Sequence, residues 1–289
     1  MSDSDARYRD SYFTVSDGLK LHYRDYPGPA GRPPLLCLPG LTRNARDFAA
    51  LAERHSPQFR VIALEFRGRG LSDYDPLPAR YNPLVYVRDV IELLDGLAIP
   101  QAIFVGTSLG GLVTMSTAAI APQRIAAAIL NDVGPELGQV GLDRIQDYVG
   151  KGQRFASWEQ AAEGIAAAQG PAFPDYGPAD WLATARRNCR EDDGEIVFDY
   201  DMAIDDAFVT AGPTPKIDMW PLFAALATKP LLVVHGALSE LLSAETVRKM
   251  RAAAPQARFV DVASVGHAPM LDEPEAAAAI DAFLDQFGA

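Results

Sequence analysis

Short apolar segments recur along the chain and predict the strands of one sheet. Most are apolar through their whole length, as is typical of strands that are buried on both faces. These segments lie at 33–40, 59–66, 102–106, 125–132, 229–236 and 257–264. An earlier pair, 11–15 and 19–26, flanks the turn residues Ser-Asp-Gly and predicts an antiparallel hairpin at the edge of the sheet.

Segments with helical spacing of apolar residues alternate with these strands. The predicted helices lie at 44–54, 82–97, 109–121, 243–254 and 274–287. Alternation of buried strands with amphipathic helices predicts an α/β fold, with a mostly parallel, doubly wound sheet that is covered on both faces.

The pattern changes between residues 135 and 220. This stretch is more polar, is rich in alanine, glycine and tryptophan, and contains short helical pieces but no strong strand signal. We therefore expect a core formed by residues 1–134 and 221–289, with residues 135–220 inserted as a helical cap over one edge of the sheet.

Composition and charge exclude several classes of function. The 26 basic and 38 acidic residues give a formal net charge of −12, which makes nucleic acid and anionic membrane surfaces poor partners. Cys37 and Cys189 lack the spacing of a zinc site or a disulfide framework. The first ten residues are polar and no apolar run approaches the length of a membrane span, so we expect a cytoplasmic protein.

The segment Gly106-Thr107-Ser108-Leu109-Gly110 matches G-x-S-x-G, between a predicted strand and a predicted helix. A sharp turn from strand to helix strains the backbone of the central residue and exposes its hydroxyl. The free N–H groups at the start of the following helix favour a developing negative charge. Ser108 is therefore the candidate nucleophile.

A serine nucleophile requires a base, and His267 is the best of the four histidines. It follows the last predicted strand, in the segment SVGHAPMLDEP, where a loop can reach back over the strand ends. The alternative, His235, ends a buried strand and is equally compatible with a structural role in the core.

Two carboxylates compete to orient the histidine. Glu240 follows the strand at 229–236, and Asp132 follows the strand at 125–132. We predict Glu240 as the acid of a Ser108–His267–Glu240 triad, because its loop is expected to face the His267 loop, and keep Asp132 as the alternative. The backbone N–H groups of Leu41 and Leu109 are the candidate donors to an oxyanion.

These motifs together resemble the α/β-hydrolase superfamily over nearly the whole chain. The resemblance rests on four segments: LPGLTRN (oxyanion loop), EFRGRGLSD (D-x-R-G-x-G-x-S turn), VGTSLGG (nucleophile elbow) and GHAPMLDEP (histidine loop). The chain is most similar to the branch that contains esterases, enol-lactone hydrolases, cofactor-free haloperoxidase-like enzymes and carbon–carbon bond hydrolases, with a helical cap.

The sequence departs from the family pattern at three places. Leu38-Pro39-Gly40 stands where many members have His-Gly, and Glu65 replaces the usual aspartate of the turn. The acid loop usually reads G-x-x-D, whereas here the carboxylate of Glu240 comes one residue later.

The resemblance implies a serine hydrolase that cleaves a small, largely apolar carboxylic ester or lactone through an acyl-enzyme, with no metal or organic cofactor. Trp220 and Phe223 are candidate lining residues of a substrate pocket under the cap, and they suit the core equally well. Cleavage of a carbon–carbon bond by the same residues, or a receptor that only binds a small molecule, are the alternatives. The oligomeric state is not determined by the sequence.

Overall fold

Eight strands form a central sheet in the computed structural model, which describes residues 7–205 and 218–288. The strands are β1 (Arg9–Thr14), β2 (Lys20–Tyr26), β3 (Leu35–Leu38), β4 (Val61–Leu64), β5 (Ala102–Thr107), β6 (Ile125–Asn131), β10 (Leu231–Gly236) and β11 (Arg258–Val262). Their spatial order is β1-β2-β4-β3-β5-β6-β10-β11. β1, β2 and β4 pair antiparallel, and all further neighbours are parallel. The predicted edge hairpin and mostly parallel sheet are confirmed.

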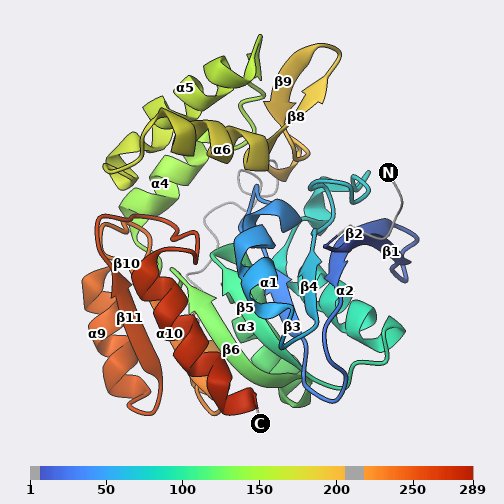
Figure 1. Cartoon of the computed structure of the whole chain (residues 1–289), viewed down its shortest axis with the longest axis vertical. Helices are drawn as coiled ribbons and strands as arrows, with labels where there is room; N and C mark the ends of the chain where they lie inside the picture. Colours follow the sequence, from blue (N-terminus) through green and yellow to red (C-terminus); the bar gives the residue numbers. More distant parts are fainter. Residues whose placement is uncertain (1–6, 206–217, 289) are drawn as a thin grey trace.

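Helices cover both faces of this sheet (Figure 1). The helices are α1 (Ala49–His55), α2 (Pro83–Gly96), α3 (Leu109–Ile120), α8 (Trp220–Leu226), α9 (Ala244–Ala253) and α10 (Pro274–Leu284). Short 3-10 helices lie at η1 (Ala45–Phe48), η2 (Pro78–Arg80), η3 (Pro122–Arg124), η4 (Gly170–Ala172) and η5 (Asp285–Phe287). The predicted helix at 44–54 is thus η1 followed by α1.

Two apolar clusters, one on each face, explain why the central strands lack polar alternation. Phe104 of β5 packs with α2, α3, α8 and α9, whereas its neighbours Ile103 and Val105 pack with α1 and α10. Because successive strand side chains point to opposite faces, a strand covered on both sides must be apolar at every position.

Residues 135–205, which follow β6, form the helices α4, α5 and α6 and a small sheet, which lie beyond the main sheet at the top of Figure 1. The helices are α4 (Gln139–Tyr148), α5 (Trp158–Gln169) and α6 (Pro178–Asn188). The strands are β7 (Arg154–Phe155), β8 (Cys189–Asp192) and β9 (Glu195–Phe198), in the order β7-β9-β8. The division of the chain into a core and a cap at 135–220 stays a prediction, and residues 206–217 lie outside the described residues.

Although the sequence shows no strong strand signal in this insertion, its described residues form β7, β8 and β9. Its strands have two to four residues, and β8 reads Cys-Arg-Glu-Asp with two exposed positions, so no apolar run marks them. The local signal was the turn: Asp193 and Gly194 both have positive φ angles, of 49° and 81°. Asp-Gly is a strongly favoured pair for such a two-residue hairpin.

Trp220 and Phe223, the predicted substrate-binding residues, do not line the cavity beside Ser108. They lie in α8, which packs against α3 on the far side of the sheet from α1. The Phe223 side chain is only 1% exposed, and the two rings pack edge to face with centroids 5.9 Å apart. Trp220 Nε1 donates a hydrogen bond to Glu136 Oε1 at 2.9 Å. Both residues therefore pack within the core, because α8 is one of the helices that cover the sheet.

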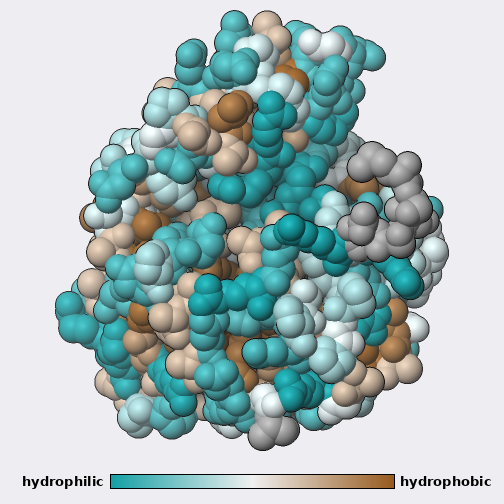
Figure 2. All heavy atoms as spheres, in the orientation of Figure 1, coloured by the Kyte–Doolittle hydropathy of each residue, from teal (hydrophilic) through white to brown (hydrophobic). Residues whose placement is uncertain are grey.

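The face shown in Figure 2 is mostly hydrophilic, with apolar side chains in small groups. Within residues 7–205 and 218–288, no helix is both long and apolar enough to cross a membrane.

We expect Phe223→Ala to lower the free energy of unfolding by about 3–5 kcal/mol, because a buried aromatic ring is replaced by a cavity. Urea unfolding followed by circular dichroism measures this change. Leu222→Ala, at the adjacent half-buried position, is the matched control and should cost clearly less. Equal losses for the two variants, or an altered KM for an ester in folded Phe223→Ala protein, would contradict the core assignment.

Candidate active site

Ser108 lies at a strained turn between β5 and α3. Its backbone has φ +51° and ψ −114°, in the left-handed half of conformational space that non-glycine residues rarely occupy. Its N–H donates to Asn131 O at 3.0 Å, which ties the turn to the end of β6. Strain of this kind at a loop that carries a hydroxyl is typical of functional sites.

Two glycines make this turn possible. A Cβ atom on Gly106 would lie 2.5 Å from Gly110 O, and one on Gly110 would overlap the carbonyl oxygen of Leu38. The start of α3 therefore rests directly on β3 and β5, and any side chain at either position would push the helix away.

His267 and Asp132 complete a line of hydrogen bonds from Ser108. His267 Nε2 lies 2.9 Å from Ser108 Oγ, and His267 Nδ1 lies 2.7 Å from Asp132 Oδ2. Asp132 is fully buried directly after β6, and its second oxygen, Oδ1, accepts the Gly236 N–H at 2.9 Å. A carboxylate held at both oxygens fixes the orientation of the imidazole, with Nε2 toward the serine.

The prediction that Glu240 occupies this position is therefore wrong, and the alternative residue Asp132 stands there. Glu240 forms an ion pair with Arg144 of α4 at 2.8 Å, and its side chain is 39% exposed. The loop after β10 is held against α4, where the Gly138 N–H donates to Leu241 O. This packing pairs Glu240 with Arg144, and its carboxylate forms no hydrogen bond with the His267 imidazole, whose two nitrogens are engaged by Asp132 and Ser108.

The choice of His267 over His235 agrees with the geometry. His235 Nδ1 lies 2.8 Å from Asp261 Oδ1 and its Nε2 lies 3.0 Å from Leu242 O. Both ring nitrogens are thus engaged, by Asp261 of β11 and by the loop after β10, and neither is bonded to Ser108.

The loop after β3 brings Leu41 to the serine. Gly40, Leu41 and Ser108 line one cavity, and a Cβ atom on Gly40 would lie only 3.8 Å from Ser108 Cβ. Among the described residues, neither the Leu41 N–H nor the Leu109 N–H donates a hydrogen bond. Leu109 opens α3, so its N–H is one of the free donors of a helix start.

The EFRGRGLSD segment, which follows β4, holds the loop after β3 by a hydrogen bond. Arg69 Nε donates to Leu41 O at 2.8 Å, and its Nη1 donates to Tyr86 OH at 2.9 Å. Arg67 is fully buried and holds Asp89 through two hydrogen bonds of 2.8 and 2.6 Å. Burial by itself would lower the pKa of Arg67, but the hydrogen bonds to its carboxylate partners outweigh it and raise the pKa, so the guanidinium stays charged.

Glu65, the residue that departs from the family pattern, has a defined role in the same turn. Its carboxylate accepts the N–H groups of Leu71 at 2.6 Å and Ala45 at 3.2 Å, and lies 2.9 Å from His22 Nδ1. Burial alone would raise the pKa of Glu65, but these hydrogen bonds hold it below its ordinary value. Because Ala45 opens η1, an ionised Glu65 anchors the far end of the loop that follows β3.

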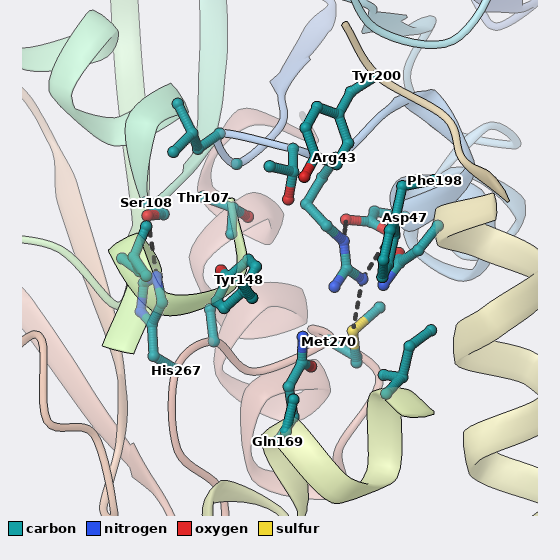
Figure 3. A pocket seen from close by; sticks show the side chains of 18 of the residues that line it. Arg43, Asp47, Thr107, Ser108, Tyr148, Gln169, Phe198, Tyr200, His267 and Met270 are labelled. Atoms are coloured by element: carbon teal, nitrogen blue, oxygen red, sulfur yellow. Dashed lines mark hydrogen bonds and ion pairs between the residues drawn. The ribbon is translucent and has the colours of Figure 1, made fainter. Parts of the chain in front are cut away.

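The cavity has a second polar group that the sequence analysis missed. Arg43 and Asp47 face Ser108 and His267 across the cavity, with Tyr148 between them (Figure 3). Arg43 Nε and Nη2 donate to the two Asp47 oxygens at 2.7 and 2.8 Å. Burial would lower the pKa of Arg43, but the attraction and hydrogen bonds of Asp47 raise it. The only sequence signal was a charged residue directly after an apolar strand and a Pro-Gly turn.

No group of three or more histidine, cysteine, aspartate or glutamate side chains in the described ranges is arranged to hold a metal ion. Cys37 and Cys189 are both buried, and burial raises the pKa of the Cys189 thiol to about 12. Both cysteines therefore behave as small core residues.

Comparison with known proteins agrees with this geometry. Residues 33–274 match the family model described as the alpha/beta hydrolase fold. A 3-hydroxybutyrate-oligomer hydrolase of Cupriavidus necator is 33% identical over 265 residues, 88% of this chain and 89% of that protein. A 2-(acetamidomethylene)succinate hydrolase of Mesorhizobium japonicum is 29% identical over 236 residues, 81% of each protein.

A solved structure is more similar still. The crystal structure of an alpha/beta hydrolase from Novosphingobium aromaticivorans superimposes with a TM-score of 0.93 at 51% sequence identity, covering 97% of this chain and 99% of that one. The family match spans most of the residues, and it includes Ser108, Asp132 and His267. The chain belongs to the α/β-hydrolase family, and its family and relatives identify it as a hydrolase.

Proposed function

We propose that this hydrolase is a serine esterase that cleaves a small carboxylic ester or lactone through an acyl-enzyme. The observation that carries the proposal is the continuous line of hydrogen bonds from Ser108 through His267 to the buried Asp132, at the wall of a cavity. A serine, a base and an orienting carboxylate in this order are the parts that acyl transfer requires.

In the first half of the reaction, Ser108 Oγ attacks the carbonyl carbon while its proton moves to His267 Nε2. The carbonyl oxygen becomes an oxyanion, for which the free N–H groups of Leu41 and Leu109 are the candidate donors. Asp132 stabilises the imidazolium that forms. The tetrahedral intermediate then breaks its bond to the alcohol oxygen, which takes the proton from His267 Nε2 and leaves.

In the second half, water attacks the acyl carbon and gives its proton to His267. The new tetrahedral intermediate releases Ser108 Oγ, which recovers the proton, and the carboxylic acid departs. The groups that act in the two halves are the same, and no electron is transferred to or from the enzyme.

Similarity to the hydrolase of 3-hydroxybutyrate oligomers supports an ester substrate, because such oligomers are joined by ester bonds. A role in binding alone is the second candidate of another class. The hydrogen bond that the Ser108 hydroxyl can donate to His267 Nε2 favours turnover, because a protein that only binds its ligand has no need of an activated hydroxyl.

We expect Ser108→Ala to lower kcat for p-nitrophenyl butyrate by at least about 10⁴-fold, because the acyl-enzyme can no longer form. A fluorophosphonate probe should label the wild type on Ser108, as mapped by peptide mass spectrometry. Ser116→Ala, at a buried serine within α3, is the control and should keep both activity and labelling. Wild-type rates in Ser108→Ala, or no turnover of any ester above buffer in the wild type, would reject the proposal.

Asp132→Asn should lower kcat by about 10⁴-fold, because an amide opposite Nδ1 favours the wrong imidazole tautomer. Glu240→Gln should change kcat less than a few fold, since it removes only a half-exposed ion pair with Arg144. Steady-state kinetics on both variants, with thermal melts to verify folding, tests the assignment. A larger loss for Glu240→Gln than for Asp132→Asn would return the acid role to Glu240.

A further inference from the structure

The guanidinium of Arg43 has donors that the protein does not use. Arg43 holds Asp47 through Nε and Nη2, and Nη2 also lies 3.7 Å from Met270 Sδ, a weak acceptor. In the described part of the chain, Nη1 donates no hydrogen bond. Because Arg43 lines the cavity, this free edge of the fork is available to a ligand beside Ser108.

Asn188 provides a second, independent observation at the same cavity. It is the last residue of α6, is only 5% exposed and lines the cavity. Its buried Oδ1 has no hydrogen-bond partner among the described residues. Buried polar groups are nearly always hydrogen-bonded, so an unpartnered amide at a cavity wall indicates a polar ligand group. A half-turn of the amide exchanges Oδ1 and Nδ2, so Asn188 can present a donor.

The segments that carry Arg43 and Asn188 are fastened to each other. Asn44 Nδ2 donates to Arg187 O at 3.0 Å, and Arg46 Nε donates to the same oxygen at 2.8 Å. The residues that follow Arg43 are therefore bonded to the residue that precedes Asn188. The two side chains enter the cavity from adjoining backbone and not from distant walls.

The pairing with Asp47 explains how a cation can lie in this cavity. An unpaired, largely buried guanidinium would be costly, and the carboxylate of Asp47 keeps it charged and fixes its orientation. The pair turns Nε and Nη2 toward Asp47 and leaves Nη1 toward the cavity. A planar fork with a free edge is well suited to a carboxylate, which accepts charge-assisted hydrogen bonds.

The position of Arg43 relative to Ser108 indicates which part of an ester substrate, the acyl chain or the alcohol, would extend toward the guanidinium. A Cβ atom on Gly40 would lie 3.8 Å from Ser108 Cβ and 3.3 Å from Arg43 Cγ, so the Arg43 stem begins beside the serine. The guanidinium then lies across the cavity from His267 (Figure 3). The alcohol oxygen of an ester must lie at His267 to receive its proton, so the acyl chain is the part that extends toward Arg43.

We propose that Arg43, assisted by Asn188, binds a carboxylate at the far end of the acyl chain, so that the substrate is an ester of an acid with a second, free carboxylate. This inference rests on the proposed esterase function of Ser108. It names the substrate class and makes Arg43 a specificity-determining residue of the same site.

Mono-p-nitrophenyl esters of dicarboxylic acids, from glutaric to suberic, test the proposal against neutral counterparts in which the free carboxylate is an amide. The wild type should prefer the anionic ester of the best chain length by about tenfold to a hundredfold in kcat/KM, the range of a charge-assisted hydrogen bond. An ester with its carboxylate on the alcohol side, 4-carboxyphenyl hexanoate, should show no such preference over its amide.

The variants remove whole ion pairs, so that no buried charge is left alone. Arg43→Gln/Asp47→Asn should reduce the preference to less than about threefold, and Arg43→Lys should give an intermediate ratio because it keeps the charge without the fork. The matched control is Arg60→Gln/Asp25→Asn, which removes another ion pair with two hydrogen bonds, each of 2.8 Å, outside the cavity and should keep the wild-type ratio. Equal use of anionic and neutral esters by the wild type would overturn the carboxylate site, as would a full preference in the Arg43→Gln/Asp47→Asn protein.

A binding measurement separates this inference from the proposed function. On Ser108→Ala protein, calorimetry should show adipic acid monoamide binding at least about tenfold tighter than the neutral diamide, with the difference lost when Arg43 and Asp47 are also replaced. Serine-dependent hydrolysis of neutral esters without any carboxylate preference would overturn only the Arg43 proposal. If no ester is hydrolysed and the fluorophosphonate leaves Ser108 unlabelled, the esterase proposal fails, and the calorimetric difference still decides for or against the carboxylate site.

Discussion

The close contact of the start of α3 with β3 and β5 is the constraint on which the site depends. Gly106 and Gly110 have no space for a Cβ atom, so the helix begins directly over the strand ends. Ser108 must then turn the chain within one residue, at φ +51°. A conformation of this kind costs on the order of 1–3 kcal/mol and persists only where the surrounding packing enforces it. The packing energy of the sheet thus maintains the exposed serine hydroxyl.

The main sheet was predictable because burial on both faces leaves a strong sequence signal. Residues 35–38 of β3, 102–105 of β5 and 231–234 of β10 are all apolar, and each belongs to the apolar cluster on one face or the other. The strands β7, β8 and β9 left no such signal, since each is short and partly exposed. Their pairing depends on the local turn at Asp193 and Gly194 and also on contacts with α5 and α6, which the sequence of the strands does not reveal.

The triad acid shows the limit of chain order as a guide. Chain order suggested that the loop after β10, the strand before the His267 unit, would supply the carboxylate. The lateral order β5-β6-β10-β11 instead places the end of β6 between the serine strand and β10. Asp132 donates its N–H to Val234 O and accepts the Gly236 N–H, so β10 contributes its backbone to the acid. Glu240 comes four residues after Gly236, the last residue of β10, where the loop already packs against α4.

The loop from Gly40 to Asp47 carries both a candidate oxyanion donor and the cation of the proposed carboxylate site. Its Leu41 N–H is a candidate oxyanion donor, and Arg43 and Asp47 present an oriented cation a few residues later. Arg69 donates a hydrogen bond to Leu41 O, and Glu65 accepts one from the Ala45 N–H. With both ends held, the distance between the oxyanion position and the guanidinium is set by rigid backbone. If the proposed function and the proposed carboxylate site hold, this fixed distance determines which length of acyl chain fits between the reacting carbonyl and the far carboxylate. The enzyme then selects its substrate by chain length as well as by charge.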